Sequence, residues 1–124
     1  MSDDLASKGR EIRTRLWGQS AFESAEAYLE KFDPGFAKHL NEQLFGGVWG
    51  RPGLPTAARS MITVAVLMAL GRGAELRLHM RGALNNGVTE AELKEIIVHV
   101  GHYSGVPTAV EGIRAFADAT NPPP

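Results

Sequence analysis

The segment that most constrains the fold runs from Pro55 to Leu70, because the helix it predicts is apolar on nearly every side. Pro55 suits the first turn of a helix, where its missing N–H is not needed. A helix without a polar face has to be covered by other parts of a protein or by lipid. Its longest apolar stretch, from Met61 to Leu70, is too short for a membrane-spanning helix, which needs about 20 residues. We therefore expect a globular protein that buries this helix, with a second subunit supplying part of the cover.

The other segments carry helix signals as well, and no stretch alternates apolar and polar residues as a strand does. The first helix is expected to be amphipathic and exposed, with Arg13 among its charged residues. We expect helices over residues 4–16, 21–32, 34–44, 55–70, 72–86, 89–103 and 107–119. The predicted fold is an all-α bundle of about six or seven helices.

Three of these boundaries depend on particular residues. Asp33 precedes a proline and is expected to be the N-cap of the third helix. Asn86-Gly87 predicts a left-handed C-cap. Thr89, followed three residues later by Glu92, predicts a capping box.

Length and composition narrow the function. The 124 residues predict one domain over 1–124, with a loose tail at 119–124. Thirteen basic and fourteen acidic residues leave no basic excess for nucleic acid or for a membrane surface. The chain has no cysteine, which excludes disulfides and thiolate chemistry. No basic region followed by an apolar run marks a signal peptide, so we expect a cytoplasmic protein.

Arg72, Glu75 and His79 form the first candidate site, because their spacing places them on one strip of a helix. A carboxylate one turn before a histidine orients the imidazole and raises its basicity, as general acid–base catalysis requires. An arginine at the head of the strip suits an anionic substrate. The alternative is an ordinary solvated helix face.

A second set comprises His99 and His102, with Glu95 one turn before His99. Two histidines and a carboxylate are possible ligands of a divalent metal. The sequence offers no separate third ligand, so we expect a polar surface that faces substrate or another subunit, and no metal.

The third set lies around the segment that joins the third and fourth helices. This segment holds Trp49 and Arg51, and the apolar helix that follows begins with Arg59, Ser60 and Thr63. An arginine and hydroxyls that line a pocket suit a ligand with a carboxylate. Alternatively, Arg59 pairs with an acidic residue near the start of its helix. His39 is expected at the surface.

Several of these segments resemble the γ-carboxymuconolactone decarboxylase family, and the similarity extends over residues 10–118. The stretches concerned are residues 70–89 (LGRGAELRLHMRGALNNGVT), 92–97 (ELKEII), 103–107 (YSGVP) and 49–55 (WGRPGLP), together with Arg59-Ser60. A redox branch of this family, similar to alkylhydroperoxidase D, carries a CxxC pair where this chain has Arg72 and Glu75. Its proton-relay glutamate falls near Ser60. Because a peroxidase needs a thiolate, the resemblance implies the scaffold without the peroxidase activity.

The resemblance implies an all-helical, alkylhydroperoxidase D-like fold that assembles into trimers or hexamers. It also implies the loss of CO₂ from γ-carboxymuconolactone, without a cofactor, to give β-ketoadipate enol-lactone in aromatic-acid catabolism. In this interpretation His79, oriented by Glu75, is the catalytic acid, and Arg51 or Arg72 holds the substrate carboxylate. The remaining substrate-binding candidates are Trp49, Arg59, Ser60 and His102.

The sequence departs from the decarboxylase pattern near its end. Family members tend to read Ile-Tyr-Cys-Gly where this chain has His102-Tyr103-Ser104-Gly105, and often have Gln in place of His99. Two alternatives therefore stay open. The scaffold can serve an isomerase or hydrolase of a related lactone or keto acid, or a non-catalytic oligomer that binds a small acid.

Overall fold

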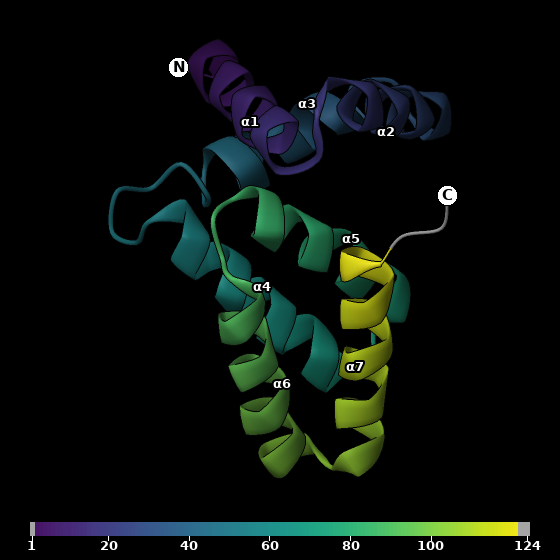
Figure 1. Ribbon diagram of the computed structural model, residues 1–124. Coiled ribbons are helices and arrows are strands. Elements are labelled where there is room, and N and C mark those ends of the chain that lie inside the picture. Colours follow the sequence, from purple (N-terminus) through teal and green to yellow (C-terminus); the bar gives the residue numbers. More distant parts are fainter. Residues whose placement is uncertain (1, 122–124) are drawn as a thin grey trace. The chain divides into compact units, whose positions relative to one another are not determined.

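The computed structural model describes residues 2–121, and all its regular elements are helical (Figure 1). The described residues form seven α-helices and one π-helix, which confirms the predicted all-α class. The chain packs into two compact units, Met1–Thr56 and Ala57–Pro124. The bounds are α1 Ser2–Trp17, α2 Gln19–Phe32, α3 Phe36–Leu40, η1 Asn41–Gly46, α4 Thr56–Leu70, α5 Gly73–Asn85, α6 Glu90–Ser104 and α7 Val106–Thr120. The prediction of one domain over the whole chain stays a prediction.

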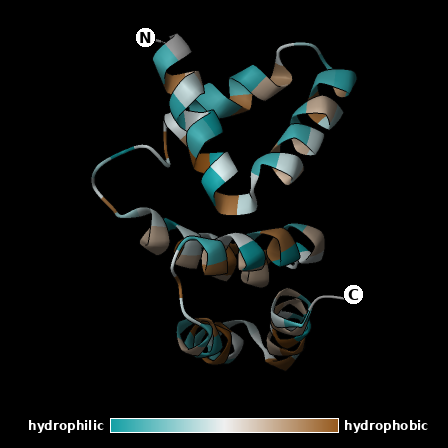
Figure 2. Ribbon diagram, turned by 45° about the horizontal axis from the view of Figure 1, so that its top comes forward, coloured by the Kyte–Doolittle hydropathy of each residue, from teal (hydrophilic) through white to brown (hydrophobic). Residues whose placement is uncertain are grey.

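In the first unit, α1 lies against the π-helix η1 at two glycines. A Cβ at Gly9 would collide with the carbonyl oxygen of Asn41, and a Cβ at Gly46 would collide with the carbonyl oxygen of Leu5. This close approach brings together a small apolar core made of Ile12, Leu16, Phe45 and Trp49. The amphipathic character of α1 and α2 is visible in Figure 2, where hydrophilic and hydrophobic residues alternate along each ribbon.

Arg13 is buried in this unit, so the expectation that it lies on an exposed face is wrong. Its side chain is 4% exposed and forms an ion pair with Glu26. It also donates a hydrogen bond of 3.0 Å to Oδ1 of Asn41, and its guanidinium lies over the rings of Phe22 and Phe45. The charge is tolerated because these partners replace the water that Arg13 loses. These partners come from two other helices, α2 and η1, so the sequence of α1 alone does not reveal them.

The predicted N-cap at Asp33 is also wrong. α3 begins at Phe36, and Gly35 precedes it with a φ of 91°. Asp33 instead ends α2, where its N–H donates to the carbonyl of Leu29, while its own carbonyl accepts the N–H of Phe36. Pro34 and Gly35 therefore make a turn between two helices. The helix that follows also widens into η1, which four-residue spacing does not predict.

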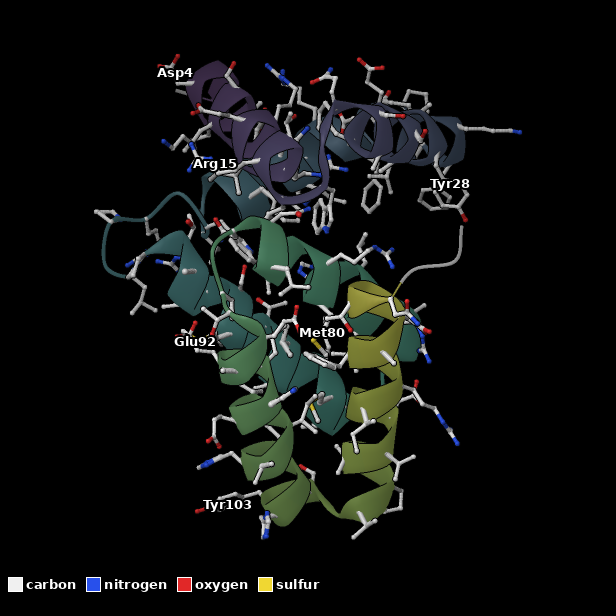
Figure 3. All side chains as sticks on the ribbon, in the orientation of Figure 1. Asp4, Arg15, Tyr28, Met80, Glu92 and Tyr103 are labelled. Carbon is white, nitrogen blue, oxygen red and sulfur yellow. The ribbon has the colours of Figure 1, made fainter. Side chains whose placement is uncertain are left out.

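The second unit, made by α4 to α7, holds the larger core. Figure 1 shows α6 and α7 side by side and antiparallel. Met80 is labelled in the middle of the unit in Figure 3, among side chains of neighbouring helices. The buried residues are Val64, Met68, Leu76, Met80, Ala83, Val88, Leu93, Ile97 and Ala115. They come from all four helices and from the turn before α6, so this core fixes α5 on its neighbours.

The helix ends of this unit follow the sequence closely. Thr89 Oγ1 accepts the N–H of Glu92, and the Glu92 carboxylate accepts the N–H of Thr89, which confirms the capping box. Gly87 has a φ of 97°, and the N–H of Val88 reaches the carbonyl of Ala83, as in a Schellman motif. This confirms the left-handed end of α5. α7 ends at Thr120, so residues 119 and 120 are helical, whereas residues 122–124 of the predicted tail lie outside the described residues.

α4 is covered on one face only within its unit. Val64 and Met68 are buried, whereas Ile62, Val66 and Leu70 are 51%, 48% and 65% exposed. Because these three residues are spaced four apart, they form one apolar stripe along the helix. No helix in residues 2–121 is both long and apolar enough to cross a membrane.

Candidate active site

The α5 face that carries Glu75 and His79 is anchored from behind by the core. Leu76, Met80 and Ala83, on the other side of the helix, are fully buried. Glu75 is exposed in the first turn, and His79 is partly buried one turn later. Arg72 precedes the helix as its N-cap residue and is exposed.

Burial has the larger effect on His79. It disfavours the charged imidazolium and lowers the pKa of His79 to about 4, although the carboxylate of Glu75 acts in the opposite direction. The sequence suggested that Glu75 would raise the basicity of the histidine. Glu75 does so, but burial outweighs it, and the imidazole is neutral at pH 7.

Ser60 on α4 reaches the same face of α5 through Asn86. Nδ2 of Asn86 donates a hydrogen bond of 3.2 Å to Oγ of Ser60, whose residue is 1% exposed. Asn86 follows His79 by seven residues, about two helical turns, and is the C-cap residue of α5. Arg59 is partly buried beside Ser60, and Thr63 donates its hydroxyl to the carbonyl of Arg59. The second unit thus brings polar residues of α4 to the His79 face of α5.

The segment with Trp49 and Arg51 belongs to the first unit. Trp49 is 5% exposed, with its ring centroid 6.0 Å from that of Phe45. It is therefore a core residue of that unit. Arg51 is exposed, two residues further along the turn.

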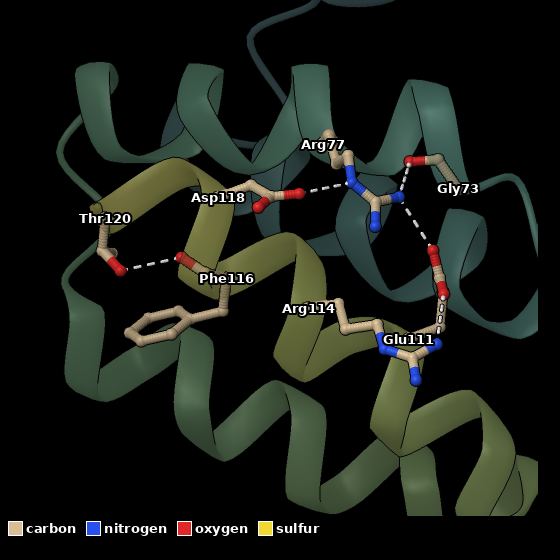
Figure 4. Close-up of polar contacts among 7 residues, drawn as sticks. All are labelled: Gly73, Arg77, Glu111, Arg114, Phe116, Asp118 and Thr120. Carbon is tan, nitrogen blue, oxygen red and sulfur yellow. Dashed lines mark hydrogen bonds and ion pairs between the residues drawn. The ribbon is translucent and has the colours of Figure 1, made fainter. Parts of the chain in front are cut away.

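An ion cluster that the sequence analysis missed holds α5 against α7 (Figure 4). Arg77 donates from Nε to Asp118 over 2.7 Å and from Nη1 to Glu111 over 2.8 Å. These bonds raise the pKa of Arg77 above its usual range. Arg77 also donates to the carbonyl of Gly73 in the first turn of α5, close to Glu75. The partners lie 34 and 41 residues away, so no local pattern signals the cluster.

The histidines of α6 are exposed near its end. His102 donates from Nδ1 to the carbonyl of Val98 over 2.8 Å. His99 stacks on Tyr103, whose side chain points outward in Figure 3. No group of three or more potential ligands among His, Asp and Glu within residues 2–121 is placed to hold a metal ion.

The shallow hollows beside α6 are almost wholly apolar. A hollow of about 440 Å³ between α4 and α6 is lined by Met61, Ala65, Ala91, Glu92, Glu95, Ile96, His99 and Val100. A second, of about 280 Å³ between α6 and α7, includes His102 with apolar residues. His79 lines neither of them. Neither hollow therefore brings the two histidine sets of the sequence analysis together.

Comparison of the sequence with known proteins identifies its family. The sequence model of the carboxymuconolactone decarboxylase family matches residues 34–118. The chain belongs to the carboxymuconolactone decarboxylase family. The matched range begins just before α3 and includes α4, α5 and α6, so it contains every candidate site residue named above. The resemblance seen in the sequence is confirmed.

Two relatives within this similarity are decarboxylases. The chain is 44% identical over 110 residues to a 4-carboxymuconolactone decarboxylase of Acinetobacter baylyi, covering 88% of this chain and 82% of the relative. It is 35% identical over 109 residues to a nitrosuccinic acid decarboxylase of Metarhizium robertsii, covering 88% and 76%. These two relatives of the chain are thus named for the decarboxylation of different acids.

Proposed function

We propose that the chain is a carboxy-lyase that converts γ-carboxymuconolactone, or a close lactone acid, to β-ketoadipate enol-lactone in the breakdown of aromatic acids. The observation that carries the proposal is the 44% identity to a 4-carboxymuconolactone decarboxylase over 88% of the chain. The similarity includes α5, which carries Glu75 and His79, and Arg72, the residue that precedes this helix. An isomerase or hydrolase of a related lactone is the alternative on the same scaffold.

A second candidate substrate is a nitro acid, favoured by the 35% identical nitrosuccinic acid decarboxylase. The two acids share an electronic feature. In each, the bond to the departing carboxylate lies next to a group that accepts electrons, either the unsaturated lactone or the nitro group. Both reactions therefore build an oxygen-centred anion that hydrogen-bond donors can stabilise.

The lactone reaction needs no cofactor, because the substrate accepts its own electrons. The bond between the γ-carbon and the carboxylate breaks, and CO₂ leaves. The electron pair moves through the ring double bond into the lactone carbonyl and gives a dienolate. A proton then adds to the α-carbon and restores the carbonyl. The protein has to hold the substrate, stabilise the dienolate oxygen and deliver this proton.

We assign the proton to His79 and the binding of a substrate carboxylate to Arg72 or Arg51. Both arginines are exposed, and a guanidinium matches the geometry of a carboxylate. His79 is neutral in the free protein, because its pKa is about 4. A substrate with two carboxylates adds negative charge beside the imidazole and raises its pKa. On substrate binding the imidazole therefore takes up a proton from the solvent, and the dienolate later receives this proton from His79.

We also propose that the protein works as a trimer or hexamer in the cytoplasm. The exposed apolar stripe of Ile62, Val66 and Leu70 on α4 supports self-association, because exposed apolar surface of this kind marks interaction sites.

The test is incubation of the purified protein with γ-carboxymuconolactone, nitrosuccinic acid and a panel of carboxylated lactones. CO₂ release is measured together with the loss of ring absorbance. Release from the lactone, retained after exhaustive dialysis against a chelator, supports the proposal. Ring opening without CO₂ indicates a hydrolase, and activity that zinc restores after dialysis contradicts the cofactor-free mechanism. Release from nitrosuccinic acid alone selects the second substrate.

A further inference from the structure

Ser60 is a hydroxyl buried in the second unit with an unusual partner. It lies on α4, is 1% exposed, and accepts a hydrogen bond of 3.2 Å from Nδ2 of Asn86 at the end of α5. Among the residues that the structure describes, Asn86 is the one hydrogen-bond partner of the Ser60 hydroxyl. A hydroxyl that accepts from an amide keeps its own hydrogen for donation.

Other hydroxyls on the helices of this unit use their hydrogens differently. Thr63, Thr108 and Thr120 each donate to the backbone carbonyl four residues earlier, at 2.8, 3.4 and 2.8 Å. This internal bond satisfies the donor inside its own helix. Ser60 has no such bond within residues 2–121, so a buried donor is left for another partner. Buried donors without partners are costly, and proteins retain them rarely.

The position of Asn86 connects this donor to the candidate site. Asn86 follows His79 by seven residues, which is two helical turns and a rise of about 10 Å on the same face. A carboxylated lactone presents only acceptor oxygens, in its carboxylates, ring oxygen and carbonyl. An arginine and a histidine cannot serve all of them, so a further neutral donor has a chemical use.

We infer that Ser60 donates its hydroxyl hydrogen to a substrate oxygen and that Asn86 is the positioning residue that fixes Ser60 as a donor. This inference rests on the proposed function. It gives Ser60, already a substrate-binding candidate from the sequence, the role of hydrogen-bond donor, and it adds Asn86. The Asn86 amide occupies a lone pair of Ser60 and so directs the hydroxyl hydrogen away from itself. Ser60 then stabilises a carboxylate or the dienolate oxygen, while His79 handles the proton.

Two substitutions test the inference from opposite sides. Ser60→Ala removes the donor. Asn86→Asp replaces the amide by a carboxylate, which only accepts, so it captures the Ser60 hydrogen and turns it away from the substrate. Each is expected to lower kcat/KM for CO₂ release by about 10- to 100-fold, as for loss of one bond to a charged group. Because both act on one hydrogen, the double variant is expected to lose no more than either single variant.

Thr120→Val is the matched control, since it removes a helix hydroxyl whose hydrogen is already bonded to the Phe116 carbonyl. It is expected to keep wild-type kcat/KM. Thermal unfolding of every variant separates an effect on the site from an effect on folding. Full activity in Asn86→Asp overturns the positioning role of Asn86. Losses of activity that add up in the double variant overturn the claim that both residues act through the hydroxyl hydrogen of Ser60.

A binding measurement keeps the inference separate from the proposed function. Calorimetric titration uses a saturated lactone with a carboxylate on the γ-carbon, which cannot lose CO₂ by this route. The donor role of Ser60 is supported if the saturated lactone binds Ser60→Ala and Asn86→Asp more weakly than it binds the wild type and Thr120→Val. Equal binding, or no binding to any of them, overturns it. A wild type that binds the analogue but releases no CO₂ from any substrate overturns the proposed function alone.

Discussion

Glu75 lies one turn before His79 on α5, and its carboxylate raises the pKa of the imidazole by less than burial lowers it. The net result is a histidine with a pKa of about 4, well below the ordinary value of 6.5. A neutral imidazole beside an exposed carboxylate responds to added negative charge by taking up a proton. This relationship links the stability of the protein and its proposed chemistry to the same side chain.

The first prediction concerns stability against pH. His79 has a lower pKa in the folded protein than in the unfolded chain, so between pH 6.5 and 4 the unfolded chain binds more protons. The contribution of neutral His79 to the free energy of unfolding is complete above pH 6.5 and is lost as the pH falls toward 4. We expect the free energy of unfolding to fall by about 2 kcal/mol over this range, after allowing for the partial exposure of His79. Urea unfolding across this range checks it. His79→Gln should flatten this part of the profile, and an unchanged slope would contradict the assignment.

The second prediction concerns turnover. His79→Ala is expected to lower kcat by about 100- to 10,000-fold, because the proton for the α-carbon loses its donor. Glu75→Gln is expected to lower kcat less, because it misorients the imidazole and lowers its pKa further. His39→Ala, on the first unit, is the control and should retain wild-type kinetics. Steady-state kinetics with the lactone measure all three. Near-normal turnover in His79→Ala, with turnover abolished in His102→Ala, would move the catalytic acid to α6.

The third prediction separates binding from chemistry. Arg72→Ala or Arg51→Ala is expected to raise KM by about 10-fold or more with little change in kcat, because a charged hydrogen bond to the carboxylate is lost equally from ground and transition states. Arg114→Ala, on the exposed surface of α7, is the control. A fall in kcat with unchanged KM in both arginine variants would show that neither is a simple carboxylate ligand.

Most of the fold was predictable, because its signals are local. The capping box of Thr89 and Glu92 and the left-handed Gly87 depend on residues within one turn of each other. The exceptions have non-local causes. Arg13 is buried because Glu26 and Asn41, from two other helices, surround it. Asp33 ends one helix and does not cap the next, because Pro34 and Gly35 form the turn between them.

The part of the candidate site that lies on one helix was predictable from the sequence. The strip on α5 follows from spacing, and the buried Leu76, Met80 and Ala83 on its other side agree with it. The bond between Ser60 and Asn86 joins two helices across 26 residues, and the Arg77 cluster reaches further still. The net pKa of His79 depends on burial, which spacing does not report. The roles of these residues in catalysis stay predictions.

The fourth prediction concerns the buried network of the first unit. Arg13→Ala is expected to lower the free energy of unfolding by about 3 kcal/mol, because it leaves Glu26 and Asn41 partly buried without their cation. The matched control is Arg15→Ala, which removes an exposed ion pair of 3.6 Å with Glu11. Such pairs contribute about 0–1 kcal/mol. Chemical denaturation measures both. Equal effects would show that the Arg13 network contributes no more than a surface pair.

The last prediction concerns self-association through α4. Ile62, Val66 and Leu70 expose an apolar stripe that the second unit leaves uncovered, and burying it in an assembly removes it from water. We expect the protein to sediment as a trimer or hexamer at micromolar concentration. Val66→Glu places a charge in the middle of the stripe, and such a charge is costly to bury, so it should weaken assembly by at least about 10-fold. Lys94→Glu, an exposed change on α6, is the control for altered charge. A wild-type monomer at this concentration, or an assembly indifferent to Val66→Glu, would place the contact elsewhere.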